Sequence, residues 1–314
     1  MKPDDGYISF IVNPRAGASS SKLTCRRFVD YLVEKRFEVR VRHTRSLDHA
    51  NHLAAEAADD PSCSMVVVVG GDGTVRDVAE GLAGSAKPLF IVPQGTENLL
   101  ASELGFDERL QTLIRTFEAG YTRPLDLGRL NGHCFTSIVG VGLDAEVVCR
   151  VSRNRHGNIG YNDYFWPLWR TFWSYKFRPL CVEVDGEQVY EGPGLVWIGN
   201  ISRYAMGVKI LHHAEFGDGL LDICVYRCAT KLCALKYTGM TLAKRHARAK
   251  GVTYKQGRSV RVSSAAGGIR TEIDGDPGPK LPVQIEVIPQ AVHVMVPEDA
   301  KPAGIRTRIV RALG

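Results

Sequence analysis

The segment from residue 65 to 82 joins a strand pattern to a helix pattern through a loop of glycines. Met65 to Val69 is continuously apolar, and Gly-Gly-Asp-Gly-Thr follows at 70–74. A short apolar run is typical of a strand buried on both faces of a parallel sheet. From Val75 to Leu82 the apolar residues recur with helical spacing. The chain therefore contains a strand–loop–helix unit of an open α/β sheet, and such sheets bind ligands at the carboxyl ends of their strands.

The composition of this loop indicates a phosphate ligand. Glycines let the backbone approach a phosphate closely, and free N–H groups at a helix start attract anions. Asp72 would repel bare phosphate, so we expect it to act through Mg²⁺. The alternative is a tight strand-to-helix turn without a ligand.

Two further loops have the same design. The apolar strand Ile8–Val12 ends in Asn-Pro-Arg-Ala-Gly at 13–17, and Leu89–Val92 ends in Pro-Gln-Gly-Thr-Glu-Asn at 93–98. The P-loop motif and the dinucleotide fingerprint after the first strand are both absent. Three successive strand ends with polar, glycine-containing loops predict one shared nucleotide site.

The three loops, N-P-x-x-G, G-G-D-G-T and P-x-G-T-x-N in that order, resemble the diacylglycerol kinase, sphingosine kinase and bacterial lipid kinase family. The second loop alone is shared with NAD kinases and phosphofructokinases. Later segments are more specific: the family's D-x-G at 126–128, its D-G-x-L-D at 218–222, and its D-G-E near 274–276. The resemblance covers residues 7 to 296. It implies a lipid kinase with a parallel-sheet domain of the phosphofructokinase and NAD kinase type.

The resemblance, together with the loop chemistry, predicts how ATP is held. Thr44 matches a nucleotide-contacting threonine of the family, and Arg15 is either a phosphate contact or a solvated surface residue. The expected nucleotide-binding residues are Asn13, Gly17, Thr44, Gly70, Gly71, Asp72, Gly73, Thr74, Gly95, Thr96 and Asn98.

A kinase also needs a carboxylate that accepts the proton of the acceptor hydroxyl. The resemblance assigns this base to the late D-G-E motif, which reads Asp274-Gly275-Asp276 here. Aspartate is one methylene shorter than glutamate, and a misplacement of about 1 Å can cost roughly 100-fold in rate. Either the backbone compensates and Asp276 is the base, or Asp274 is. Asp185-Gly186-Glu187 also spells D-G-E, but its flanking strand patterns predict a hairpin turn. We expect Asp276, Asp274 and Asp72 to be catalytic.

One departure from the family concerns the metal. Many bacterial members have Asp directly after the Asn of the third loop, where this chain has Leu99. The resemblance implies that this family Asp lies with the equivalents of Asp72 and Asp126 in one network of metal and water. Asp72 and Asp126 are therefore the metal candidates, with Glu97 a substitute.

The resemblance also implies a second, structural Mg²⁺. Asp218 matches its side-chain ligand, and backbone carbonyls near Glu215 and Leu220 would complete it. The alternative for Asp218-Gly219 is a plain turn.

The order of elements predicts two domains. Strands and helices alternate up to Ala119, which favours a parallel sheet covered on both faces. After Tyr121 strand patterns dominate, which favours an antiparallel β-sandwich. We expect a nucleotide-binding α/β domain at 1–123, with a tail at 298–314 that packs back on it, and a lipid-binding sandwich at 124–297. Helices are expected to interrupt the sandwich at 161–175 and 231–249, with another in the tail at 303–313.

The substrate side is marked by an aromatic segment at 161–177. Trp166, Trp169 and Trp173 form one helical stripe. Such stripes are usually core, but Tyr and Trp also favour membrane interfaces. A basic run at 244–250, with further arginines in the tail at Arg306, Arg308 and Arg311, fits either a solvated helix face or attraction to anionic lipid.

Composition and charge limit the classes of binding partner and the cell compartment that we expect. The chain has 314 residues, a net charge of +6 and eight cysteines without a C-x-x-C pair. We expect a cytoplasmic, peripherally membrane-associated enzyme of phospholipid metabolism with reduced thiols and no nucleic-acid partner; a homodimer is left open. The first rival is a soluble small-molecule kinase of the NAD kinase type. The second is a catalytically weak, lipid-binding regulatory protein. Neither composition nor motif selects the lipid.

Overall fold

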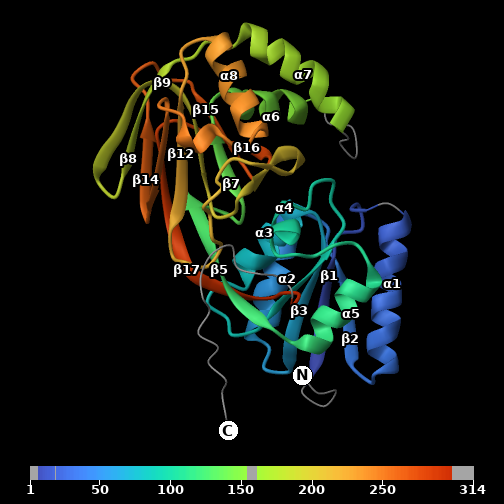
Figure 1. Ribbon diagram of the computed structural model, residues 1–314. Helices are drawn as coiled ribbons and strands as arrows, with labels where there is room; N and C mark the ends of the chain where they lie inside the picture. Colours follow the sequence, from blue (N-terminus) through green and yellow to red (C-terminus); the bar gives the residue numbers. More distant parts are fainter. Residues whose placement is uncertain (1–5, 18, 154–160, 299–314) are drawn as a thin grey trace.

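The computed structural model describes residues 6–17, 19–153 and 161–298. Figure 1 shows two domains stacked end to end, with the elements up to Ala119 forming one and most of the later elements forming the other. The helix expected at 303–313, and the expected tail at 298–314 apart from Glu298, lie outside the described residues.

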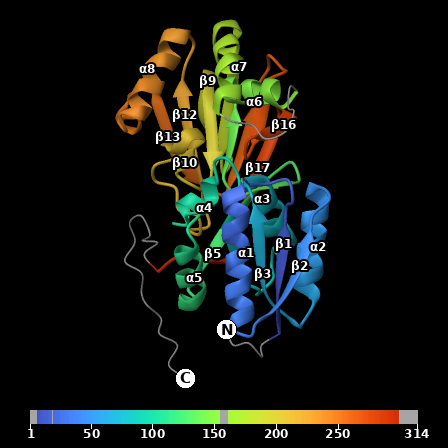
Figure 2. The ribbon, with the colours of Figure 1, turned by 90° about the vertical axis from the view of Figure 1, so that its right-hand side faces the viewer.

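The first domain is a parallel sheet between helices. Its strands are β1 (Tyr7–Val12), β2 (Glu38–His43), β3 (Cys63–Gly70) and β4 (Leu89–Pro93), in the spatial order β2-β1-β3-β4. Its helices are α1 (Ser19–Glu34), α2 (Leu47–Asp59), α3 (Asp72–Gly81), α4 (Leu99–Glu103) and α5 (Leu110–Ala119). The pairs α1/α5 and α2/α3 flank the sheet (Figure 2). The valines of β3 are fully buried, as expected for a central strand.

The second domain is an antiparallel sandwich, which confirms the expected fold class. One sheet contains β7 (Ile138–Val141), β9 (Glu187–Gly199), β12 (Leu221–Arg227), β13 (Val252–Gly257), β15 (Arg270–Ile273) and β16 (Asp276–Lys280). The other contains β5 (Thr122–Leu130), β6 (His133–Phe135), β8 (Pro179–Val184), β14 (Ser259–Ser263) and β17 (Val283–Met295). Strand β9 pairs first with β8 and then with β7 and β12, so it passes from one sheet to the other. Buried side chains of both sheets, such as Val139, Val196, Val260 and Ile285, share one core.

Two long strands connect the domains. β5 and β17 pair over most of their length, and Val294 of β17 also pairs in parallel with Leu89 of β4. The chain therefore crosses between domains through a hydrogen-bonded ribbon. Such a ribbon fixes the orientation of one domain on the other more firmly than a flexible linker does.

Helices cover the outer end of the sandwich. The remaining elements are α6 (Leu143–Arg153), α7 (Tyr161–Ser174), α8 (Lys231–Leu242), the short strands β10 (Arg203–Tyr204) and β11 (Val208–Lys209), and the 3-10 turns η1 (Ala205–Gly207) and η2 (His246–Arg248). Figures 1 and 2 place α7 and α8 at the end of the molecule remote from the first domain.

Some elements differ from expectation, each for a local reason. The single helix expected at 231–249 ends at Leu242, and Lys244 adopts a positive φ of 55° that a helix does not tolerate. Two strands expected at 283–296 are one strand, with an irregularity between Ile288 and Val292. Helix α6 and strand β13 are absent from the sequence-based expectation, because valine-rich and mixed polar segments carry no decisive periodicity.

Candidate active site

The second and third glycine loops touch backbone to backbone. A Cβ atom added at Gly71 would lie 2.9 Å from Cα of Gly95, and one added at Gly95 would lie 2.7 Å from Cα of Gly71. Real Cβ atoms do not approach a backbone atom so closely, so both positions need glycine. The two strand ends therefore form one continuous surface of backbone, as the loop pattern predicts.

The first loop joins this surface through side chains. Asn13 donates from Nδ2 to Oγ1 of Thr74 at 3.0 Å. Gly17 has a φ of 83°, and a Cβ there would lie 2.8 Å from Oε1 of Gln94 on the third loop. Thr44 is buried at the end of β2, and its N–H donates to the carbonyl of Val12. All three loops, with the threonine of the second strand, thus meet at one edge of the sheet.

Asn98 braces the third loop. Its φ of 49° is left-handed. Its Oδ1 accepts from the N–H of Gly95 at 2.6 Å, and its Nδ2 donates to the carbonyl of the same residue at 3.0 Å. These bonds satisfy both ends of the amide within the loop, so Asn98 acts on a ligand through the loop shape.

Asp72 lies at the first turn of α3 and faces α4. Its Oδ1 accepts from the N–H of Leu100 at 3.3 Å. Burial, together with the charges of Asp274 and Glu97, raises the pKa of Asp72 to about 6. A cation beside Asp72 would relieve this accumulated negative potential, which is the condition a metal-binding carboxylate needs. Leu99, at the position of the family aspartate, packs against the apolar core.

Asp274 is held by the second domain. Its carboxylate accepts from the N–H groups of Thr136 and Ser137 at 2.9 Å and of Ile138 at 3.0 Å. Burial raises its pKa, against the opposing influence of the nearby Arg76 guanidinium and these bonds. A carboxylate with this many donors is anchored, so Asp274 shapes the turn that carries Asp276.

Asp276 is the carboxylate that faces the glycine loops. A Cβ added at Gly73 would have Oδ2 of Asp276 as its nearest neighbour, at 3.8 Å. The same oxygen accepts from Nη1 of Arg76 at 3.1 Å, and the side chain is 37% exposed. Arg76 also bonds Asp77 at 3.1 Å and is almost buried. Although burial opposes its charge, the carboxylates of Asp274, Asp77 and Asp276 raise the pKa of Arg76.

Arg76 is the site residue that sequence reasoning missed. It lies in the first turn of α3, two residues after Thr74, on a helix that starts at the glycine loop. A cation so close to an expected phosphate cradle is a signal that could have been noticed. Its partner Asp276 is 200 residues away in the chain, so only the fold shows that the two meet.

A buried carboxyl pair lies behind the Asp274 turn. Glu272 accepts from the N–H of Gly275 at 2.7 Å. A Cβ added at Gly140 would approach both Glu272 and Asp144 closely, so the two carboxyls face the same glycine. Burial raises the pKa of Asp144 to about 6, and burial and Asp144 raise that of Glu272 well above its usual value. Glu272 therefore supports the turn through its bond to Gly275.

The other metal candidates lie elsewhere. The carboxylate of Asp126 accepts from the N–H groups of Gly219 and Gln290, both at 2.6 Å, so it ties β5 to the turn at Gly219 and to the irregular part of β17. Asp218 accepts from the N–H of Leu220 at 3.0 Å, the geometry of a turn. Within the described residues these two bonds are the hydrogen bonds of the Asp126 carboxylate, and its expected grouping with Asp72 around a metal stays a prediction. Within the described ranges no three His, Cys, Asp or Glu side chains are grouped as a metal centre.

Polar contacts hold the two domains together around Asp276 and Arg76. Glu103 of α4 accepts from the hydroxyl of Ser202 at 2.8 Å and pairs with Nε of Arg203 at 3.2 Å. Glu97 of the third loop accepts from the N–H of Met206 at 3.1 Å. Glu97 therefore fixes the third loop on the second domain while contributing negative potential at Asp72.

The rival D-G-E segment is a hairpin turn, as predicted. Asp185 and Gly186 have φ angles of 50° and 84° between β8 and β9. The Asp185 carboxylate accepts from the N–H groups of Arg258 and Ser259 at 2.9 and 2.8 Å. These contacts lie within the sandwich, away from the glycine loops.

The aromatic stripe of α7 is exposed. Trp166, Trp169 and Trp173 are 66%, 52% and 51% exposed, so the stripe is not buried in the core. On α8, Leu232 and Leu235 are also exposed. No helix within the described ranges is long and apolar enough to cross a membrane.

Known proteins share both halves of this architecture. A family model for the diacylglycerol kinase catalytic domain matches residues 8–130, and one for the YegS C-terminal NAD kinase beta sandwich-like domain matches residues 137–296. Proteins named diacylglycerol kinase from Bacillus subtilis and Mycobacterium tuberculosis (strain H37Rv) are 25% and 28% identical over 293 and 301 residues. The alignments cover 92% and 93% of this chain and 96% of each relative. A crystal structure described as a Bacillus anthracis diacylglycerol kinase matches the fold with a TM-score of 0.71 and 20% identity, over 96% of this chain and all of that one.

Proposed function

The chain belongs to the diacylglycerol kinase family of lipid kinases, and from this premise we propose that it transfers the γ-phosphate of ATP to a hydroxyl group of a lipid where its two domains meet. The observation that carries the proposal is the position of Asp276. This carboxylate comes from the sandwich, faces the glycine loop of the other domain and pairs with Arg76 at 3.1 Å.

In this proposal the nucleotide phosphates lie on the touching loops around Gly71 and Gly95. The close approach of Gly71 and Gly95 lets one ligand contact both loops, and the start of α3 adds a favourable dipole. Arg76 then neutralises charge on the transferred phosphoryl group, the main requirement in phosphoryl transfer. Arg76 is paired with carboxylates in the structure, so on phosphate binding it would exchange one anionic partner for another.

The residues present fit a Mg²⁺ ion at Asp72. Magnesium is usually bound through one or two carboxylates with substrate phosphates and water. Burial raises the pKa of Asp72, and the nearby charges of Asp274 and Glu97 raise it further, so a cation there would be favourable. When bound, the ion would neutralise phosphate charge. Asp72 would hold it, and Glu97 lies near enough to add to its attraction.

The position of Asp276 suits this carboxylate to accept the proton of the acceptor hydroxyl. The acceptor hydroxyl loses its proton to this carboxylate while its oxygen forms the bond to the γ-phosphorus. The bond from that phosphorus to the β-phosphate oxygen breaks, and ADP leaves. Phosphate charge draws Arg76 away from Asp276, which leaves the carboxylate able to accept the proton. The anchored Asp274 keeps the turn in place throughout.

The acceptor is proposed to be a diacylglycerol-like or sphingoid-like lipid reached from a membrane surface. The relatives are named diacylglycerol kinases. The exposed tryptophans of α7 and leucines of α8 suit contact at the depth of lipid headgroups. Peripheral binding to an anionic surface is part of this proposal.

The test is a lipid phosphorylation assay with radiolabelled ATP and Mg²⁺. A lipid extract is presented in mixed micelles, and the labelled product is identified by mass spectrometry. We expect one lipid class to be phosphorylated, and Asp276→Asn to lower kcat at least about 100-fold. Asp185→Asn, in the other Asp-Gly turn, is the matched control and should leave kcat unchanged. Nucleotide binding without turnover on any lipid would favour the regulatory alternative, and transfer to NAD would favour the small-molecule kinase.

A further inference from the structure

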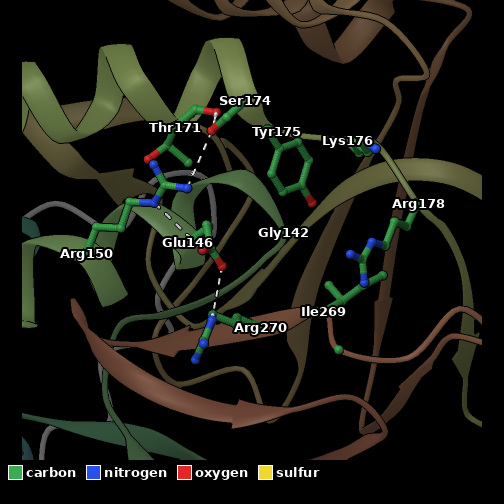
Figure 3. Close-up of a pocket in the computed structure, with 11 residues that line it drawn as sticks. Gly142, Glu146, Arg150, Thr171, Ser174, Tyr175, Lys176, Arg178, Ile269 and Arg270 are labelled. Atoms are coloured by element: carbon green, nitrogen blue, oxygen red, sulfur yellow. Dashed lines mark hydrogen bonds and ion pairs between the residues drawn. The ribbon is translucent and has the colours of Figure 1, made fainter.

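A cationic cavity of about 290 Å³ lies between α6, α7 and β15, outside the proposed active site. Figure 3 shows the side chains of Arg150, Arg178 and Arg270 around it, with Lys176 at its edge and Glu146 inside. Four cationic side chains against one carboxylate leave a surplus of three positive charges. Such a surplus in a concave site favours an anionic ligand.

The cations are arranged by their contacts. Glu146 shares its two oxygens between Nε of Arg270 at 3.0 Å and Nε of Arg150 at 3.7 Å. Arg178 donates from Nη1 to the carbonyl of Gly267 at 2.9 Å. Ser174 of α7 accepts from Arg150 at 3.4 Å. The guanidinium groups are therefore held at the cavity while retaining donors that no carboxylate uses, which suits bidentate binding of phosphate.

The cavity borders the exposed apolar surface. Thr171 and Ser174 line it from α7, the helix whose Trp169 and Trp173 are half exposed. Lys231 at the start of α8 lies over the ring of Trp173, with Nζ 5.3 Å from the ring centroid. The cavity therefore adjoins the helix that would contact the membrane in the proposed function.

We propose that this cavity binds the phosphate group of an anionic phospholipid, and so makes membrane docking selective for such lipids. The inference rests on the proposed function, because it assumes that the enzyme works at a membrane through α7. The phosphate would accept from the arginines and take the place of Glu146 as their counter-charge.

The bound phospholipid is distinct from the acceptor. Ile273 pairs with Asp276, so three residues of β15, about 10 Å of strand, separate Arg270 from the level of Asp276. In a glycerophospholipid only a small headgroup lies between the phosphate and its terminal hydroxyl. One lipid therefore does not fill the cavity and present its hydroxyl to Asp276 together, and the cavity holds a second, anchoring lipid.

The test compares vesicles of phosphatidylcholine with vesicles that also contain phosphatidylglycerol, using the full chain. The variant Arg150→Gln/Arg178→Gln removes two cavity charges. The control Arg26→Gln/Arg27→Gln removes two exposed charges on α1 of the other domain. Since each cation at an anionic surface contributes roughly fivefold in affinity, we expect the cavity variant to bind phosphatidylglycerol vesicles about 25-fold more weakly. The control should match the wild-type protein.

Two further arms identify the ligand. With vesicles whose negative charge comes from oleate, the wild-type protein should bind less well than to phosphatidylglycerol at equal charge, and the cavity variant should lose this preference. Equal responses of all three proteins to surface charge would overturn the proposal in favour of diffuse attraction. Binding of inorganic phosphate to the wild-type protein but not to the cavity variant, with no preference of the wild-type protein for phosphatidylglycerol over oleate vesicles, would overturn it in favour of a soluble anion.

Activity separates this inference from the proposed function. On a short-chain acceptor in solution, the cavity variant should retain wild-type turnover, because the cavity lies outside the catalytic groups. Absence of kinase activity in every protein would refute the proposed function, while the vesicle measurements would still decide on the cavity.

Discussion

Asp274→Asn separates an anchoring role from a catalytic one in the Asp-Gly-Asp turn. The Asp274 carboxylate accepts three backbone N–H bonds, from Thr136, Ser137 and Ile138. Asparagine keeps the shape but has one acceptor oxygen and an NH₂ group. Both carboxylate oxygens accept from backbone N–H groups. Whichever oxygen the NH₂ group replaces, it must therefore face at least one N–H donor.

The magnitude follows from these bonds. A buried donor left unpaired costs about 1–3 kcal/mol, and each surviving bond loses its charge assistance, worth about 1 kcal/mol. Asparagine is neutral, so the cost of burying the Asp274 charge is removed, and this gain offsets part of the lost stability. The raised pKa of Asp274, which burial causes, reflects that cost. We expect a net loss of about 3 kcal/mol in the free energy of unfolding, or roughly 6–12 °C in Tm.

The assay pairs thermal melting with steady-state kinetics, and Asp276→Asn is the comparison. Asp276 is partly exposed and makes one ion pair, so its variant should melt close to the wild-type temperature and lose kcat instead. An Asp274→Asn protein that kept its Tm but lost as much kcat as Asp276→Asn would refute the reasoning and identify Asp274 as the base.

Three other outcomes are expected. Because the pKa of Asp72 is raised to about 6, the ionised form that attracts Mg²⁺ is lost as pH falls through 6, and kinase activity at limiting Mg²⁺ should fall over the same pH range. The variant Asp72→Asn should lower turnover at least about 100-fold. It should also raise Tm at pH 8, since it removes a charge whose burial costs stability above pH 6. Gly71→Ala places a Cβ 2.9 Å from the backbone of the third loop and should lower Tm, whereas Gly73→Ala, with nothing nearer than 3.8 Å, should not. Trp169→Ala/Trp173→Ala should leave Tm nearly unchanged and raise KM for lipid in vesicles but not for a short-chain acceptor, while a heavy loss of Tm would show the stripe to be core.

Local patterns were sufficient for the glycine loops and insufficient for the carboxylates. Asp185-Gly186 and Asp274-Gly275 have the same sequence signature and the same positive φ angles. One turn is bonded within the sandwich, and the other supports a carboxylate opposite Gly73. The flanking strand patterns predict the hairpin at Asp185, but they do not show which turn faces the glycine loops, because that depends on which part of the fold packs opposite.

Asp126 shows the converse limit. A resemblance placed it with Asp72 at a metal, yet its carboxylate is taken up by Gly219 and Gln290. Glu97, in contrast, does lie near Asp72, while it also bonds the N–H of Met206. A motif predicts that a carboxylate is needed, but the neighbours that consume its oxygens come from distant segments.

The sequence by itself determined the parallel sheet, the three loops at its edge, the sandwich and the family, because these depend on periodicity and on glycine at positions of close backbone contact. Only the tertiary structure decided that Arg76 meets Asp276, that Asp274 is an anchor, and that four cations surround one cavity beside the tryptophans of α7. Those relations join residues up to 200 positions apart. They depend on the β5–β17 ribbon, which fixes the orientation of one domain relative to the other. No local sequence pattern encodes contacts between residues so far apart in the chain.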